Sequence, residues 1–373
     1  MSGFSELAGV GLAEALRLQG ITEPTAVQER AVPPITEGRD VIASSETGTG
    51  KTMAYLIPTV MKLDPDIKQP QVIILLPTHE LASQVHKQAA LLLKNIGAER
   101  EAALVIGGAN AGRQTDALKR KPFIIVGSAG RILELIRSGK LKAHSVRTVI
   151  LDEADRLVDE INYGPVAAVL KCTLKDRQVL AFSATVGEGT LVRLKDLMKD
   201  PVILNVGRGT NSPKAARPAL PENFQHCLFV SEQRDKIKLL RKIINGRNIK
   251  KAIVFLNNTH SIEMIAERLN HHNIRAGALY GNMLKNDRRN VLNAFRKGGI
   301  AVLAASDMAA RGLDIKDLTH IINYDVPEDP EVYLHRAGRT GRMGGFGTVI
   351  TLANEWEMQF VHRIGKEFKI HFI

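Results

Sequence analysis

Short runs of β-branched and other apolar residues recur along the chain, and each is followed by a polar turn and a stretch with helical periodicity. This alternation predicts parallel sheets, because a helix must carry the chain back before the next strand can run in the same direction. The expected strands fall into two groups: 40–44, 71–77, 102–108, 123–127, 148–153 and 179–185, then 226–230, 251–257, 275–281, 300–306, 320–326 and 348–353. The sequence therefore predicts an α/β protein with two doubly wound parallel sheets.

The length of 373 residues also indicates two domains, because single hydrophobic cores seldom grow beyond about 250–300 residues. Between the two groups of strands, residues 207–223 are rich in Gly, Pro, Asn and Ala and show neither helical nor strand periodicity. Such a segment is typical of a flexible linker. We predict a first domain over 1–208, a linker over 209–220 and a second domain over 221–373.

The chain carries a net charge of +12, which indicates an anionic partner. Most of this surplus lies in the second half: residues 1–210 carry +3 and residues 211–373 carry +9, with a basic run at 241–251. We therefore expect the second domain to make strong contact with the partner.

Cysteine content and the amino-terminal sequence indicate in which cellular compartment the protein is found. Cys172 and Cys227 are too few for a disulfide framework or a zinc site, and we expect reduced thiols. Residues 1–20 lack the cationic start and apolar core of a secretory signal, and no apolar run reaches the ~18 residues of a membrane span. The sequence predicts a cytoplasmic protein that does not bind a membrane.

Residues 45–52 read SETGTGKT and lie between an expected strand and an expected helix, which is the context of a phosphate-binding P-loop. Gly48 and Gly50 allow backbone conformations that point N–H groups at phosphate oxygens, and the helix amino terminus adds a favourable dipole. Lys51 would reach the β- and γ-phosphates, and Thr52 would bind Mg²⁺. Serine stands at the first position, where the strict pattern has glycine.

An acidic cluster, Asp152, Glu153, Asp155 and Asp159, begins directly after an apolar run. A P-loop requires a carboxylate at the end of a neighbouring buried strand to hold the metal, and Asp152 is the expected contact. Glu153 would orient and activate the attacking water. Bound Mg²⁺, lysine and arginine side chains would neutralise the cluster.

The order of motifs resembles that of the DEAD-box RNA helicases of superfamily 2. The resemblance rests on SETGTGKT, DEAD at 152–155, SAT at 183–185, SDMAARGLD at 306–314 and HRAGRTGR at 335–342, and it extends over nearly the whole chain. It implies two RecA-like domains in tandem, an RNA-stimulated hydrolase of the ATP phosphoanhydride, and ATP with Mg²⁺ as cofactors.

The segment GITEPTAVQ at 20–28 resembles the Q motif, which senses adenine. The Gln28 amide suits this role because it can both donate to and accept from adenine. Phe4 is the isolated upstream aromatic, and Ile21 stands where the family usually has an aromatic residue, which weakens the expected packing.

In the second domain, the resemblance implies Arg339 and Arg342 as arginine fingers on the γ-phosphate, each worth ~10³ to 10⁵ in rate, and Asp314 near the ribose. Asp155 is the expected partner of the SAT motif, while Asp307 and Arg311 would hold the interface between the domains. The residues expected to bind nucleotide or metal or to catalyse are Phe4, Ile21, Gln28, Glu46, Thr47, Gly48, Thr49, Gly50, Lys51, Thr52, Asp152, Glu153, Asp314, Arg339 and Arg342. The residues expected to couple the sites are Asp155, Ser183, Thr185, Asp307, Arg311 and His335.

The family holds single-stranded RNA across both domains by its backbone and 2′-hydroxyls. Two replacements affect this grip: His79 stands in place of Arg and removes a fixed positive charge, and Ser128-Ala129 stands in place of Thr-Pro. In the second domain Tyr280 and Asn282 replace His and Asp, and the loss of a negative charge at Asn282 offsets the change at His79. The corresponding RNA-binding residues are Pro77, Thr78, Glu80, Gly108, Gly130, Arg131, Gly281 and Arg288.

Three functions are compatible with these motifs: a helicase that unwinds short RNA duplexes or remodels ribonucleoproteins, an ATP-gated RNA clamp, and a DNA-directed translocase of the same superfamily. The short SAT motif and the Q motif argue against the third. Because no RNA-recognition domain or basic tail follows the last motif, we expect weak sequence preference and steep salt dependence for single-stranded or short duplex RNA. We expect a monomer that acts on a ribonucleoprotein or ribosomal particle, with ribosome assembly the favoured pathway.

Overall fold

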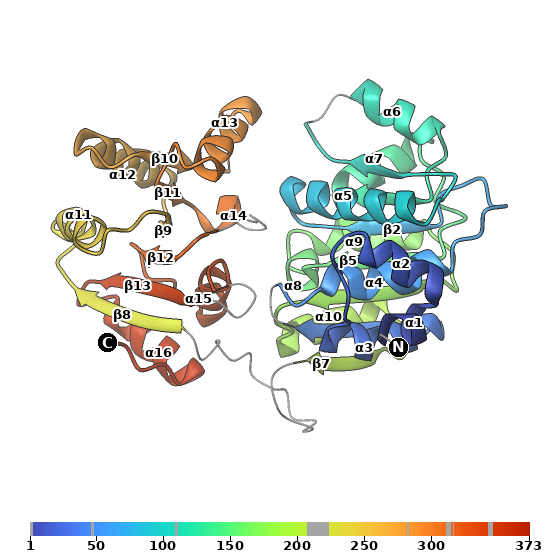
Figure 1. The fold of residues 1–373 in the computed structure, drawn as a ribbon, viewed down its shortest axis with the longest axis horizontal. Coiled ribbons are helices and arrows are strands. Elements are labelled where there is room, and N and C mark those ends of the chain that lie inside the picture. Colours follow the sequence, from blue (N-terminus) through green and yellow to red (C-terminus); the bar gives the residue numbers. More distant parts are fainter. Residues whose placement is uncertain are drawn as a thin grey trace. The chain divides into compact units, whose positions relative to one another are not determined.

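The structure, a computed structural model, describes residues 3–45, 48–108, 111–206, 224–281, 283–310, 315, 317–341 and 346–373. The chain divides into two compact units, Met1–Ala216 (unit 1) and Arg217–Ile373 (unit 2). Each unit is a parallel sheet with helices on both faces (Figure 1). The predicted linker, 209–220, lies outside the described residues, and the domain limits given above remain predictions.

Unit 1 contains a sheet of seven parallel strands in the order β3-β4-β2-β5-β6-β1-β7. The central strands are buried on both faces, which explains their continuous apolar sequences. The sequence prediction missed β7, an edge strand whose side chains are mostly half-buried and therefore carry a weak pattern. The strands are β1 (Val41–Ser45), β2 (Val72–Leu75), β3 (Ala102–Val105), β4 (Ile124–Gly127), β5 (Thr148–Asp152), β6 (Gln178–Ser183) and β7 (Val202–Val206).

Helices cover both faces of this sheet because successive strand residues point to opposite sides. Val41 and Ala43 belong to the core under α1 to α5, whereas Ile42 belongs to the core under α6 to α10. The helices are α1 (Gly3–Ala8), α2 (Val10–Arg17), α3 (Ala26–Thr36), α4 (Lys51–Met61), α5 (His79–Asn95), α6 (Ala111–Lys119), α7 (Ala129–Arg137), α8 (Ala154–Leu157), α9 (Tyr163–Lys171) and α10 (Glu188–Leu197).

Unit 2 contains six parallel strands in the order β10-β11-β9-β12-β13-β8. Helices α11 and α12 pack on one face of this sheet, and the other four pack on the opposite face. The strands are β8 (Phe224–Val230), β9 (Ala252–Phe255), β10 (Ala276–Leu279), β11 (Val302–Ala305), β12 (His320–Asn323) and β13 (Gly347–Ala353). The helices are α11 (Lys236–Gly246), α12 (Thr259–His271), α13 (Lys285–Arg296), α14 (Asp307–Ala310), α15 (Pro330–Ala337) and α16 (Met358–Phe368).

Strand order determines where the predicted motifs meet. The carboxyl ends of parallel strands share one edge of a sheet, and ligands bind there in open α/β sheets. In unit 1 the P-loop, DEAD and SAT motifs follow the adjacent strands β1, β5 and β6, whereas the predicted RNA segments follow the adjacent strands β2, β3 and β4. One edge of unit 1 therefore carries the residues predicted to bind nucleotide in one half and those predicted to bind RNA in the other half. Within the described residues, no helix is both long and apolar enough to cross a membrane.

Candidate nucleotide and nucleic-acid sites

The P-loop connects the carboxyl end of β1 to the amino terminus of α4. Gly48 and Gly50 have φ values of 84° and 93°, which side-chain-bearing residues rarely adopt. A Cβ atom at Gly50 would lie 2.5 Å from Nε2 of Gln28, so only glycine fits there. The loop thus has the backbone freedom and the helix terminus that phosphate binding requires.

Ser45, which replaces the first glycine of the strict pattern, is buried and closes the base of the loop. Its hydroxyl lies 2.6 Å from the hydroxyl of Thr49, and its carbonyl accepts a hydrogen bond of 2.5 Å from Nζ of Lys51. The Lys51 side chain therefore connects the end of the loop to its beginning. The serine is compatible with a P-loop, because its side chain bonds within the loop.

Gln28 connects α3 to the P-loop. Its Oε1 accepts from the backbone N–H of Thr25 at 2.9 Å, and its Nε2 donates to the carbonyl of Gly50 at 3.1 Å. The side chain is only 2% exposed, yet one amide proton and one lone pair remain beyond these two bonds. The structure thus shows that Gln28 also supports the P-loop. Its contact with adenine remains a prediction.

The two apolar residues predicted for the adenine pocket have packing roles in unit 1. Phe4 is buried in the core beneath α1. Ile21 is half-buried and packs against the same core. Their contact with adenine remains a prediction.

Asp152 is held from two sides at the end of β5. The Tyr55 hydroxyl donates to Oδ2 at 2.8 Å, and the backbone N–H of Glu153 donates to Oδ1 at 3.0 Å. Burial raises the pKa of the Asp152 carboxyl, while the Tyr55 hydrogen bond and the charge of Lys51 act against this rise. Burial and the Asp152 charge also raise the pKa of Tyr55 well above its ordinary value, and the Thr52 hydroxyl contacts the same phenol.

Glu153 has a left-handed backbone conformation, with φ 54° and ψ 53°, between β5 and α8. For a residue other than glycine this conformation costs roughly 1–2 kcal/mol. Such strain is found where a structure fixes a functional group. Because of this conformation, only Glu153 separates the end of β5 from the start of α8. Asp152 and Asp155 therefore both remain near the end of the strand.

A hydrogen bond joins the loops after β5 and β6. The Ser183 hydroxyl donates to Oδ1 of Asp155 at 2.6 Å, which is the pairing that the resemblance implied. The backbone N–H of Thr185 donates to the Ser183 hydroxyl at 3.3 Å. The Thr185 hydroxyl is buried and has no hydrogen-bond partner within the part of the chain that the structure describes. A group that enters this site can therefore bind it without breaking an existing bond.

The predicted RNA residues of unit 1 lie along the carboxyl ends of β2, β3 and β4. Pro77 and Thr78 follow β2, and the Thr78 side chain caps α5 by accepting from the N–H of Leu81 at 3.3 Å. Gly108 follows β3 with a φ of 64°. The ring of His79 lies beside the preceding glycine, 3.6 Å from where its Cβ would be. Glu80 occupies the first turn of α5, and Gly130 that of α7.

Arg131 is anchored within unit 1 rather than extended into solvent. Its guanidinium donates to Glu134 at 2.5 Å and to Oε1 of Gln114 at 3.4 Å, and its side chain is 15% exposed. Gln114 in turn donates to the carbonyl of Ile106 at 2.9 Å. Sequence reasoning missed Gln114, because no motif marks an amide in the middle of a polar helix. Arg131 therefore supports the loop after β3 as well as being a predicted RNA contact.

Arg336 is the most important residue that sequence reasoning missed. It lies inside the HRAGRTGR segment, is 1% exposed, and uses all five of its N–H donors. Two donate to the carboxylate of Asp307, both at 2.7 Å, and the others reach Asn323, the carbonyl of Asp325, and Asn257 at 2.7–3.1 Å. Asp307, which was predicted to hold the domain interface, is thus bound within unit 2.

The other predicted residues of unit 2 are connected to their own unit as well. Arg339 is 6% exposed, and its Nε donates to the carbonyl of His335 at 3.3 Å. Arg288 donates to the carbonyl of Ala309 at 2.9 Å and so links α13 to α14. Gly281 follows β10 at the carboxyl edge. The predicted residues outside the described part of the chain are Glu46, Thr47, Asn282, Arg311, Asp314 and Arg342.

Comparison with known proteins decides the family. The DEAD/DEAH box helicase model matches residues 25–193, and the helicase conserved C-terminal domain model matches residues 235–344. The DEAD-box ATP-dependent RNA helicase CshC of Bacillus cereus is 41% identical over 361 residues, which cover 96% of this chain and 90% of that protein. This chain belongs to the DEAD-box RNA helicases. The probable ATP-dependent RNA helicase YfmL of Bacillus subtilis is 39% identical over 94% of this chain and 90% of that protein.

Solved structures share the fold over the whole chain. Saccharomyces cerevisiae Dbp5, bound to RNA and ADP BeF3, has a TM-score of 0.88 at 24% identity and covers 100% of this chain and 95% of its own. Mss116p bound to ssRNA and AMP-PNP has a TM-score of 0.86 at 24% identity, with 99% and 77% covered, and shows the same fold. The two parallel sheets are thus tandem RecA-like domains. Membership of the family makes the protein an RNA-dependent ATPase of the helicase class.

Proposed function

We propose that this DEAD-box helicase couples ATP binding and hydrolysis to local, non-processive unwinding of short RNA duplexes or to remodelling of ribonucleoprotein particles. The observation that carries this proposal is the shared edge of unit 1, where the nucleotide half and the predicted RNA half lie on neighbouring strands. The hydrogen bond between Asp155 and Ser183 joins two loops of the nucleotide half. A change at the phosphates can therefore pass between the loops after β5 and β6, and β5 adjoins β2, which precedes the predicted RNA residues Pro77 and Thr78.

The residues present fit a triphosphate with Mg²⁺. Asp152, Thr52 and Tyr55 place a carboxylate and two hydroxyls together beside the P-loop, and Mg²⁺ prefers one or two carboxylates plus substrate phosphates. Within the described ranges no group of three or more His, Cys, Asp or Glu side chains could hold a metal alone. Mg²⁺, held by Thr52 and Asp152, would neutralise charge that develops on the phosphates.

Hydrolysis follows from the roles proposed for the side chains. Lys51 binds the β- and γ-phosphates, and Glu153 accepts a proton from the water that attacks the γ-phosphorus. The bond between the γ-phosphorus and the β,γ-bridging oxygen breaks, which releases ADP and phosphate. Arg339 and Arg342 of unit 2 stabilise the transition-state charge when RNA brings the units together. Hydrolysis is therefore conditional on RNA.

RNA is the proposed macromolecular partner, bound through phosphates and 2′-hydroxyls with weak sequence preference. We further propose that the protein acts as a monomer in the cytoplasm on a ribonucleoprotein or ribosomal particle, in ribosome assembly. The same residues would also serve an ATP-gated clamp. Strand separation of a short duplex, compared with ATP-dependent retention of one strand, distinguishes the two.

The test is ATP turnover with and without RNA in Glu153→Gln and in a matched control. Glu160→Gln makes the same chemical change at a side chain that is 90% exposed and pairs only with Arg193 at 3.5 Å in the described structure. We expect RNA to stimulate the wild type and Glu160→Gln equally, and Glu153→Gln to lose at least about 10²-fold. The proposal is contradicted if RNA does not change the rate of ATP turnover, or if Glu153→Gln turns over ATP at the wild-type rate.

A further inference from the structure

One side of α11 carries a cationic surface that none of the motifs explains. Lys238, Arg241, Lys242 and Asn245 line an open hollow of about 540 Å³. Their spacing of three and four residues places them on one side of the helix. The apolar residues of α11 pack on the opposite side, into the core of unit 2. We call Lys238, Arg241 and Lys242 the α11 surface.

The charges of the α11 surface are uncompensated. None of its three cations forms an ion pair with a carboxylate of the described chain. Nε of Arg241 is buried and lacks a hydrogen-bond partner in the same described part. Like charges at this spacing destabilise a helix by about 0.2–0.5 kcal/mol per pair. An anionic ligand would remove this repulsion.

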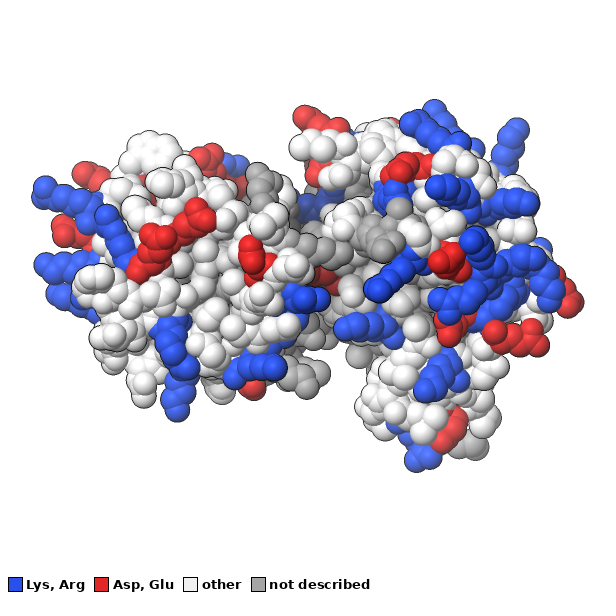
Figure 2. All heavy atoms as spheres, turned by 90° about the horizontal axis from the view of Figure 1, so that it is seen from above, with Lys and Arg blue, Asp and Glu red and all other residues white. Residues whose placement is uncertain are grey.

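Two histidines at the end of α12 lie near α11. His271 and His272 follow each other there, with ring centroids 5.2 Å apart. Desolvation and the positive charge of Arg241 lower the pKa of the exposed His272. Figure 2 shows Lys and Arg side chains gathered at the end of unit 2 where Figure 1 labels these two helices.

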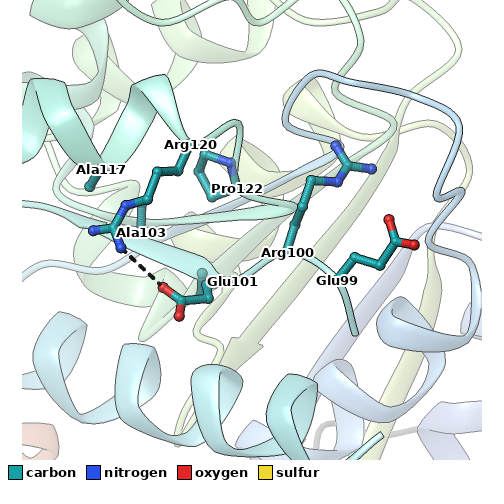
Figure 3. A pocket seen from close by; sticks show the side chains of 8 residues that line it. Glu99, Arg100, Glu101, Ala103, Ala117, Arg120 and Pro122 are labelled. Carbon is teal, nitrogen blue, oxygen red and sulfur yellow. Dashed lines mark ion pairs between the residues drawn. The ribbon is translucent and has the colours of Figure 1, made fainter. Parts of the chain in front are cut away.

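A hollow in unit 1 shows the opposite arrangement (Figure 3). It is lined by Glu99, Arg100, Glu101 and Arg120 among others and has a volume of about 190 Å³. There Arg120 points to Glu101, 3.8 Å away. Arg100 donates to four backbone carbonyls at 2.7–3.5 Å and stacks on Phe123. Each of these two arginines thus has partners within unit 1, whereas no ion pair joins the α11 cations to a carboxylate of the described chain.

The α11 surface is separate from the predicted RNA residues. The helix begins at the carboxyl edge of the sheet, where Nζ of Lys236 donates to the carbonyl of Tyr324 just after β12. From there α11 runs back towards the start of β9, so Lys238 lies in the first turn near the edge, and Arg241 and Lys242 lie one to two turns further along the helix. Gly281 and Arg288 instead follow β10 at the edge.

We propose that the α11 surface is a second RNA contact, which binds the phosphate backbone of RNA that extends beyond the motif residues. Contacts between these three cations and phosphates give affinity and salt dependence without sequence preference. Because this contact does not involve the P-loop, it holds RNA in the absence of nucleotide. The proposal rests on RNA being the partner in the proposed function.

The test compares two triple variants of the full chain, each of which removes three positive charges. Lys238→Gln/Arg241→Gln/Lys242→Gln removes the α11 surface. Lys119→Gln/Arg120→Gln/Arg147→Gln is the control, because these cations lie 3.0–4.0 Å from the carboxylates of Asp116, Glu101 and Asp64. Binding is measured without nucleotide, across a salt series, to a short single strand and to the same strand with a long flank.

We expect the α11 variant to lose about 2 from the log–log salt slope for the long RNA, at roughly 0.7 per phosphate contact. Its affinity for the long RNA should fall roughly 10- to 100-fold at low salt. Binding of the short strand, and maximal ATP turnover with saturating RNA, should stay at the wild-type level. The double variant Lys238→Gln/Lys242→Gln, which changes only exposed side chains, should show about two thirds of the slope change.

An α11 variant that binds the long RNA with the wild-type slope overturns the proposal, and so does an equal loss in the control. Loss of short-strand binding to the same degree also overturns it, because the surface would then not be separate. If RNA fails to stimulate ATP turnover in the wild type, the proposed function fails, whatever the two variants show.

Discussion

The contacts of Arg336 allow a prediction for the stability of unit 2. Its guanidinium satisfies five acceptors, two of them on Asp307, and is 1% exposed. Removal of one partner of a buried ion pair costs about 3–5 kcal/mol. The Asp307 side chain is 24% exposed and keeps some water, which favours the lower value. The buried amide of Asn323 also loses its donor, at about 1 kcal/mol. We therefore expect Arg336→Gln to destabilise unit 2 by about 4 kcal/mol.

This loss is large beside the 5–15 kcal/mol that stabilises an ordinary domain. With a urea dependence of about 2 kcal/mol per molar, the unfolding midpoint should fall by about 2 M. The chain has one tryptophan, Trp356, in unit 2, where its ring lies 5.0 Å from that of Phe360. Its fluorescence therefore follows the unfolding of unit 2 within the intact chain.

Two variants serve as references for Arg336→Gln. Arg336→Lys keeps the charge but offers three donors from a point charge in place of a planar fork, so it should fall between the wild type and Arg336→Gln. Arg363→Gln changes an exposed arginine of α16 and should leave the midpoint unchanged. If Arg336→Gln unfolds at the same urea concentration as Arg363→Gln, the reasoning is refuted.

Three further predictions concern pH, metal and coupling. Burial lowers the pKa of His226 to about 4 from 6.5. As pH falls, His226 is therefore protonated in the unfolded chain before it is protonated in the folded chain. The free energy of unfolding of unit 2 should consequently decrease by up to about 3 kcal/mol between pH 6.5 and pH 4. In a pH series of unfolding midpoints His226→Gln should lack this loss, and an unchanged slope contradicts it. Tyr55→Phe leaves Oδ2 of Asp152 without its donor, so ATP turnover should need several-fold more Mg²⁺; an identical Mg²⁺ titration would refute this. Ser183→Ala removes a bond worth about 1.5–3 kcal/mol, so duplex unwinding should fall at least about tenfold more than ATP turnover, and equal losses would exclude a coupling role.

The pattern of strands and helices was predictable because buried parallel strands are apolar on both faces. β7 escaped prediction because it is an edge strand whose side chains are mostly half-buried. Several predicted strands were too long for a different reason. The run 71–77 continues past the end of β2 at Leu75, because Leu76, just beyond the strand, is also apolar and fully buried.

The parts of the site that lie in one continuous segment were predictable, because the P-loop is made by local backbone geometry. Tyr55 was not, since its contact with Asp152 joins positions 97 residues apart. Gln114 and Arg336 likewise act through partners on other elements, and no spacing rule in the sequence identifies them. Arg131 was predicted for RNA from its motif position, yet only the structure shows that its guanidinium is bonded to α6 and α7.

The most direct test of the proposed mechanism is ATP turnover by unit 1 alone, as residues 1–216, against the intact chain, each with saturating RNA. If arginines of unit 2 complete the nucleotide site, the isolated unit should turn over ATP at least about 10³-fold more slowly than the intact protein. Equal turnover by the two would contradict the proposal that RNA controls hydrolysis by bringing the units together.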